Sequence, residues 1–177
     1  MKYVGLLRGI NVGGNTKVPM EELRHVCEGL GFTSVKTILN SGNVVFETHQ
    51  TKEDIVQKEL EQALEKQFNF PIRVLVRPFD ELERLLQEDP FKGIPVTKDT
   101  RLYVTFLSEK HALTKDDVAK AAVHNAQITR LTTREICSVI NITPQKNTTD
   151  LMEFLGKLFG KNITTRNWNT LIKLGAL

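Results

Sequence analysis

The sequence predicts an α+β protein made of two tandem ferredoxin-like (βαββαβ) α/β-plait subdomains plus a C-terminal helix. Three observations lead to this fold class. Short apolar segments of strand length alternate with longer segments whose apolar residues recur every three or four positions. Clusters of glycine, proline and asparagine separate them, and the order of elements partly recurs in the second half. With 177 residues, the chain can form two small domains, expected at residues 1–90 and 91–177.

The first half follows the full order of the ferredoxin-like unit. Pro19 suits the first position of a helix. Ser41-Gly42 is the kind of two-residue turn that closes a hairpin, and Thr51 with Asp54 resembles a capping box. The expected elements are a strand at 2–8, a helix at 19–30, strands at 35–40 and 43–48, a helix that opens at Thr51, and a strand at 72–77.

The second half repeats this order less regularly. Pro78 starts a short linking helix, and residues 88–100 form a connecting loop that contains two prolines and a glycine. Thr114 with Asp117 resembles a further capping box. The expected elements are a strand at 102–107, a helix from Thr114, strands near 126–131 and 134–142, a helix at 151–159, a short strand at 163–165 and a terminal helix containing Trp168.

The charge of the chain is modest but unevenly distributed. The formal net charge is +3, which is too small by itself to indicate nucleic-acid binding. Residues 1–20 carry three basic side chains and residues 154–177 carry four, and neither segment contains an acid. If the two ends meet in space, they form a basic surface that favours an anionic ligand. The alternative is that acid-free ends arise by chance in a basic chain.

The composition disfavours several classes of protein. No stretch approaches the roughly 20 apolar residues of a membrane helix, and the first apolar run, closed by Arg8, is too short for a signal peptide. Cys27 and Cys137 are isolated at predicted apolar positions, so we expect buried thiols, and neither a disulfide framework nor a zinc site. These observations predict a cytoplasmic protein with no membrane partner and no metal.

The expected topology gathers three polar loops of the first half at one edge of its sheet. They are the glycine-rich loop at 9–17, the hairpin at 40–43 and the loop at 69–71. A glycine-rich loop between a strand and a helix can direct backbone N–H groups toward an anion. The loop fails the P-loop pattern, because Asn15 stands where the lysine is required. The alternative is that its glycines only allow tight turns.

A second polar segment, residues 164–167, lies near the C-terminus, and the second plait is expected to place it beside the hairpin at 132–134. The Arg166 guanidinium could bind a phosphate or carboxylate in bidentate fashion. Alternatively, Thr165 or Asn167 caps the last helix and Trp168 belongs to the core. If both segments line one basic hollow, the predicted ligand-binding residues are Arg8, Gly9, Asn11, Gly13, Gly14, Lys17, Asn43, Thr165, Arg166 and Asn167.

The sequence has no recognisable catalytic constellation. Its four histidines are scattered without the spacing of metal ligands or of a proton relay, and His25 is expected on the surface of a helix. Acidic residues fall mainly on polar helix faces, and none lies in the loops expected to converge. No cofactor is predicted, and enzymatic activity is left open.

Three segments together resemble a known family. They are Leu6 to Gly14, Leu39 to Phe46 and Thr164 to Thr170. In this order, spread over nearly the whole chain, they are similar to the bacterial family catalogued as domain of unknown function 1697. The resemblance implies an αβ architecture of ferredoxin-like plaits and implies no activity. Asn40 departs from the family pattern, in which a glutamine is expected.

Three kinds of function follow from these observations. The first is binding of a phosphate-bearing or other anionic small molecule. Nucleic acid is a less favoured partner, because RNA-binding sheets of this topology display aromatic side chains and no aromatic pair stands out on the central strands. The second is an enzyme in which arginine and backbone amides stabilise negative charge. The third is an interaction module that forms a dimer or other oligomer.

Overall fold

The computed structural model describes residues 1–12, 16–108, 126–143, 148–160 and 162–177. Within these residues the chain is an α+β protein with two four-stranded antiparallel sheets and five helices. It divides into two compact units, which are described separately. Unit 1 comprises Met1–Gln87 and Ile172–Leu177, and unit 2 comprises Glu88–Leu171.

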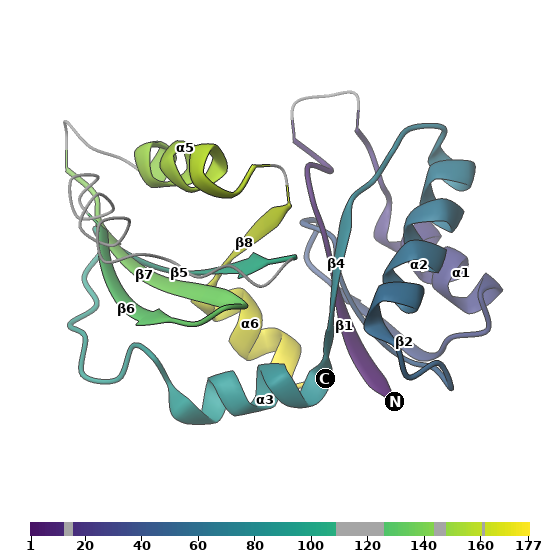
Figure 1. Cartoon of the computed structure of the whole chain (residues 1–177), viewed down its shortest axis with the longest axis horizontal. Helices are drawn as coiled ribbons and strands as arrows, with labels where there is room; N and C mark the ends of the chain where they lie inside the picture. Colours follow the sequence, from purple (N-terminus) through teal and green to yellow (C-terminus); the bar gives the residue numbers. More distant parts are fainter. Residues whose placement is uncertain (13–15, 109–125, 144–147, 161) are drawn as a thin grey trace. The chain divides into compact units, whose positions relative to one another are not determined.

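The sheet of unit 1 has the strand order β2-β3-β1-β4. Every pairing in it is antiparallel, so β1 and β2 run in the same direction on either side of β3, as predicted. Figure 1 shows α1 and α2 on the same face of this sheet. The elements are β1 (Lys2–Leu7), α1 (Met20–Gly29), β2 (Thr33–Ile38), β3 (Asn43–Glu47), α2 (Glu53–Phe68), β4 (Val74–Pro78) and α3 (Phe79–Glu88).

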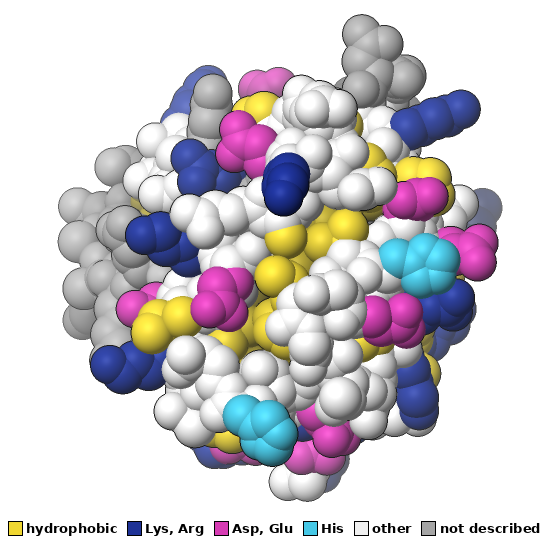
Figure 2. Space-filling view, turned by 90° about the vertical axis from the view of Figure 1, so that its right-hand side faces the viewer, with side chains coloured by type: hydrophobic (Ala, Val, Ile, Leu, Met, Phe, Trp, Pro, Cys, Tyr) yellow, Lys and Arg dark blue, Asp and Glu magenta, His cyan; other side chains and the backbone are white. Residues whose placement is uncertain are grey.

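The core of unit 1 lies between its sheet and these two helices. Leu23 and Cys27 of α1 and Leu60 of α2 are fully buried there, at the helical spacing that the sequence predicted. Phe46 of β3 stacks on Phe32, with 4.5 Å between the ring centroids. Figure 2 views the molecule from the side that carries α1 and α2, and shows apolar side chains at the bottom of a shallow depression.

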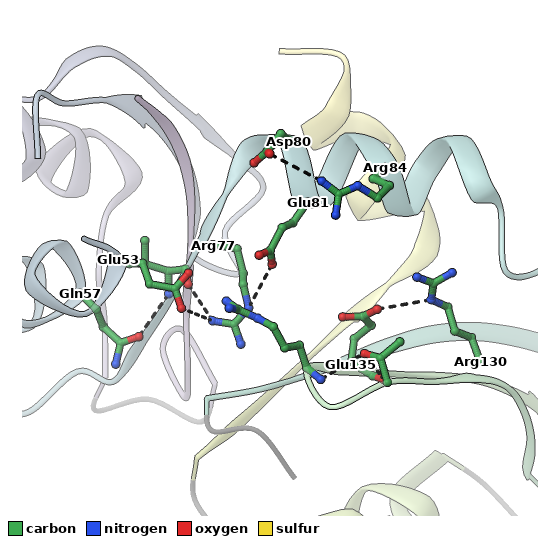
Figure 3. Close-up of polar contacts among 11 residues, drawn as sticks. Glu53, Gln57, Arg77, Asp80, Glu81, Arg84, Arg130 and Glu135 are labelled. Carbon is green, nitrogen blue, oxygen red and sulfur yellow. Dashed lines mark hydrogen bonds and ion pairs between the residues drawn. The ribbon is translucent and has the colours of Figure 1, made fainter. Parts of the chain in front are cut away.

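A buried arginine links β4 to the starts of α2 and α3. Arg77 is only 4% exposed, and its guanidinium lies 3.7 Å from the Glu53 carboxylate and 4.0 Å from that of Glu81 (Figure 3). It also donates a hydrogen bond to the carbonyl oxygen of Val76 at 2.8 Å. Because a buried charge is stable only with such partners, this cluster holds both helices to the sheet.

The local prediction for the start of α2 is wrong. The N-cap residue is Lys52, and no side chain caps the helix. The Gln50 side-chain oxygen instead accepts hydrogen bonds from the backbone N–H groups of Thr51 and Lys52. Gln50 therefore bonds the Thr51 N–H that the Asp54 side chain of the predicted capping box was expected to bond.

Unit 2 contains a second sheet, with the strand order β6-β7-β5-β8. One of its faces is covered by α5 (Figure 1), whose Leu151 and Leu155 pack with Ile140 of β7 in the core. The helix predicted from Thr114 lies outside the described residues, so the tandem ferredoxin-like arrangement stays a prediction. The elements are β5 (Thr100–Leu107), β6 (Ala126–Leu131), β7 (Glu135–Asn141), α5 (Thr148–Phe159), β8 (Ile163–Asn167) and α6 (Trp168–Gly175).

An ion-pair network supports the edge of this second sheet. The Arg130 side chain on β6 lies 3.3 Å from the Glu135 carboxylate of β7 (Figure 3) and also pairs with Glu88. These pairs, with hydrogen bonds to both carboxylates, raise the pKa of Arg130 although partial burial opposes them. The arginine therefore stays charged and ties the edge strand to its neighbour and to Glu88, the first residue of unit 2.

Candidate functional site

A cavity of about 450 Å³ opens beside the glycine-rich loop of unit 1. Its volume lies within the range of small-molecule sites. The described residues that line it come from the loop after β1, the segment leading into α1 and the hairpin between β2 and β3. They are Asn11, Thr16, Lys17, Val18, Pro19 and Asn40. A hollow therefore lies where the sequence predicts a ligand site.

Asn11 holds the walls of this cavity together. Its side-chain nitrogen donates to the carbonyl oxygens of Asn40 (2.6 Å) and Val18 (3.0 Å), and its side-chain oxygen accepts from the backbone N–H of Val18 (2.9 Å). Its φ of 57° is left-handed, a conformation that asparagine tolerates better than most residues. The Asn11 side chain, which was predicted to contact a ligand, is thus already hydrogen-bonded to both walls of the cavity.

The hairpin that forms one wall is longer than the predicted two-residue turn. Four residues, Leu39 to Gly42, separate β2 from β3. The first and the last of them have a positive φ, which is 55° at Leu39 and 72° at Gly42. The side-chain nitrogen of Asn43 donates to the carbonyl oxygen of Ile38 (3.0 Å) and to the hydroxyl of Ser41 (2.8 Å). Asn43 is fully buried, and this geometry makes it a support of the hairpin.

The predicted convergence of the loops occurs in unit 1. The backbone N–H of Leu7 donates to the carbonyl oxygen of Gly42 (2.8 Å), which joins the end of β1 to the hairpin. The backbone N–H of Arg8 donates to the carbonyl oxygen of Arg73 (2.9 Å), which joins it to the segment after α2. Strand order alone accounts for this result, because these loops share one edge of the sheet.

One charged side chain and the start of a helix lie at the cavity. Lys17 is the only ionisable side chain among the described residues that line it. Helix α1 begins beside the cavity after Pro19, and no side chain caps it, so the N–H groups of its first turn add partial positive charge. The Thr16 hydroxyl is buried and has no hydrogen-bond partner among the described residues.

Two of the predicted site residues of this loop have clear positions. Gly9 is exposed with φ of 69°, and Arg8 is partly buried. Gly13 and Gly14 lie outside the described residues. Next to the loop, Val12 is 75% exposed and Leu39 is 48% exposed. These two apolar side chains were not singled out in the sequence, since exposure cannot be inferred from residue type.

The polar segment near the C-terminus is a strand, and not the loop that was expected to group with the hairpin at 132–134. Along β8, Ile163 pairs with Leu107 near that hairpin, whereas Arg166 pairs with Val104 further along β5. A strand rises about 3.3 Å per residue, so Arg166 is carried away from the predicted group. The apolar and threonine-rich composition of the segment was the signal for a longer strand.

Arg166 itself is buried in unit 2. It is 9% exposed, and its guanidinium donates to the Thr164 hydroxyl (3.2 Å) and the Thr165 carbonyl oxygen (3.0 Å). Burial lowers the pKa of Arg166 to about 10, which leaves it charged at neutral pH. The Thr165 hydroxyl is 2.8 Å from that of Thr105. The glycine-rich loop belongs to unit 1, so a hollow shared with Arg166 stays a prediction.

The cap and the core position that were the alternatives for this segment are both present in the structure. The side-chain oxygen of Asn167 accepts a hydrogen bond from the backbone N–H of Asn169 (2.9 Å) at the start of α6, which is the capping arrangement. Trp168 is 7% exposed and meets Phe91 edge-on, with 5.1 Å between the ring centroids.

The described residues contain no group of three or more His, Cys, Asp or Glu side chains that could hold a metal ion. His25 is exposed on α1, as predicted. Within the described parts of the chain, no helix is long and apolar enough to cross a membrane. Both cysteines are free and fully buried, which confirms their prediction as core residues.

The buried thiols lead to a first testable prediction. Burial, reinforced by the nearby charges of Glu28 and Glu135, raises the pKa of Cys27 and of Cys137 to about 12. Because the thiolate is the reactive form, a thiol reagent at pH 8 should label neither cysteine in the folded protein and both after denaturation. Labelling is followed by absorbance with an aromatic disulfide reagent. Rapid labelling of one thiol before unfolding would contradict the buried assignment.

The fold and the site define a class: an α+β protein with an open cavity among the loops at one end of its first sheet. The chain belongs to the family described as protein of unknown function (DUF1697), which matches residues 1–137; this confirms the resemblance noted in the sequence. No match is found among curated proteins. Among solved structures, the chain is similar to a conserved bacterial protein, SP0830 from Streptococcus pneumoniae, with 26% identity, a TM-score of 0.72 and coverage of 99% of this chain and 97% of the other.

Proposed function

We propose that this chain, built as two ferredoxin-like plaits, binds a phosphate-bearing small molecule in the cavity beside the glycine-rich loop of unit 1. The observation that carries the proposal is the position of Lys17 as the sole ionisable side chain among the described lining residues. A phosphate placed there meets a full positive charge and no carboxylate among these residues.

The surrounding groups support the same ligand. The uncapped first turn of α1 offers backbone N–H groups, which suit a phosphate. In this proposal Asn11 and Asn43 hold the walls, and Lys17 supplies the charge. The acids of the first turn, Glu21 and Glu22, are exposed and are not among the lining residues.

The test is a calorimetric titration with pyrophosphate and with inorganic phosphate. We expect saturable binding that weakens as salt is added, because salt screens partly exposed charges. Lys17→Gln should raise the Kd by about tenfold or more, since a hydrogen bond to a charged group contributes about 1.5–3 kcal/mol.

The matched control is Lys58→Gln. Lys58 is an exposed lysine of α2 that does not line the cavity, so this variant changes the net charge equally and should bind as the wild type does. Absence of binding at about 10 mM pyrophosphate, or an equal effect of the two substitutions, would overturn the proposal.

A further inference from the structure

We propose that a second cavity, in unit 2, binds a planar heterocycle with a lactam edge, that is, an N–H beside a C=O as in hypoxanthine, guanine and uracil. The cavity encloses about 290 Å³, at the small end of ligand sites, which suits a nucleoside. It lies where the loop after α3, the start of β5 and the junction of β8 with α6 come together. The inference is independent of the proposed phosphate site.

One side of this cavity is apolar and suits a flat ring. Phe91 and Trp168 line it and are 5% and 7% exposed. Their edge-to-face contact fixes both rings, so little side-chain freedom is lost when a ligand packs there. Val96, another lining residue, is 65% exposed. A large exposed apolar side chain beside an aromatic pair gives a ring further surface to cover.

The polar residues that line the cavity include a donor and an acceptor. The side-chain oxygen of Asn167 is used by the backbone N–H of Asn169, so the orientation of the amide is set by a partner that can only donate. The side-chain nitrogen of Asn167 is then left to donate, and it has no partner among the described residues. Asn169 adds a further amide to this wall.

The acceptor is the carboxylate of Asp89. One of its oxygens accepts from the backbone N–H of Phe91 at 3.2 Å, which leaves the second oxygen for another donor. Asp89 is itself held in a left-handed conformation, with φ of 39°. A carboxylate and an amide N–H₂ together complement the N–H and C=O of a lactam edge.

Two other ligand classes fit this cavity less well. Asp89 is the only ionisable side chain among the described lining residues, so an anion is repelled. A hard cation requires about six oxygen ligands, whereas one carboxylate and two amides supply too few. The ligand class that fits this cavity best is therefore a neutral ring that can form hydrogen bonds at one edge.

The experiment uses Trp168 as its reporter, because it is the only tryptophan of the chain. The full-length protein is titrated with inosine while tryptophan emission is followed with excitation near the red edge. We expect a saturable change in emission. With 1-methylinosine, whose lactam N–H is replaced by a methyl group, and with adenosine, which lacks the lactam, affinity should fall about tenfold or more. Pyrophosphate should leave the emission unchanged.

Asp89→Asn is the informative variant, since asparagine tolerates positive φ and can still accept from the Phe91 N–H. We expect it to weaken inosine binding about tenfold. The control is Asp99→Asn, an exposed carboxylate in the same loop that does not line the cavity, which should bind as the wild type does. Equal affinities for inosine and 1-methylinosine, equal effects of the two variants, or no saturable response to any nucleoside would each overturn the inference.

Discussion

Replacing Gly42 with alanine is expected to lower the free energy of unfolding by about 2–5 kcal/mol. Two costs combine at this position. The φ of 72° is a left-handed conformation in which a Cβ is unfavourable, and the added atom would lie 2.6 Å from Ile10 Cδ1 and 2.7 Å from Leu7 Cβ. The second of these atoms cannot move without the backbone of β1, so the hairpin itself must shift. Chemical denaturation followed by circular dichroism measures the change.

Gly9→Ala separates the two costs. Gly9 has a similar φ of 69°, but an added Cβ would meet nothing within 4 Å. Its substitution should therefore cost only the backbone strain, about 1–2 kcal/mol. The Gly42 carbonyl oxygen accepts a hydrogen bond from the Leu7 N–H, which joins β1 to the hairpin that forms one wall of the cavity. Gly42→Ala should therefore also weaken pyrophosphate binding. Equal destabilisation by the two substitutions would show that the close packing under the hairpin is not rigid.

Asn11→Asp is expected to destabilise unit 1 by about 2–4 kcal/mol. The substitution keeps the shape of the side chain but replaces the nitrogen that donates to the carbonyl oxygens of Asn40 and Val18. The new carboxylate oxygen and the carbonyl oxygens of Asn40 and Val18 would then face one another with no hydrogen-bond donor among them. The same change puts a negative charge at the wall of the cavity, and pyrophosphate affinity should fall about a hundredfold. Denaturation and calorimetry measure the two effects independently.

Asn40→Asp is the matched control for this variant. The Asn40 side chain lines the same cavity and is exposed, and it is the backbone carbonyl of Asn40 that receives the bond from Asn11. This variant adds the same charge without removing a hydrogen bond, so it should weaken pyrophosphate binding and leave stability within about 0.5 kcal/mol of the wild type. If Asn11→Asp proved as stable as Asn40→Asp, the role of Asn11 as the link between the walls would be wrong.

Much of the fold could be predicted because local patterns in this chain agree with its tertiary structure. The apolar spacing that marked Leu23, Cys27 and Leu60 reflects the faces that α1 and α2 turn toward the sheet. The strand order then brings the end of β1 beside the hairpin. The capping of α2 was mispredicted because Gln50, outside the expected motif, accepts from the backbone N–H of Thr51, which the motif assigned to Asp54.

The candidate site was predictable in position but not in detail. The glycine-rich loop marked the place, and Lys17 does line a cavity there. Asn43 and Arg166 were singled out as ligand contacts because their side chains are polar. Both prove to be buried and engaged with neighbouring groups. The residue type determines which hydrogen bonds a side chain can form, and burial determines whether a ligand can reach that side chain.

By itself, the sequence determined the order of the described helices and strands, the buried positions of both cysteines and the edge of the first sheet where loops converge. These follow from periodicity and strand order, which are local or topological properties. Only the tertiary structure decided which polar groups face a cavity. Asp89 and Asn167 line one cavity although they lie far apart in the chain. The Asn11 side chain donates its hydrogen bonds to the backbone of the loops that form the walls of the other cavity. Such pairings depend on the packing of distant segments, which no local pattern encodes.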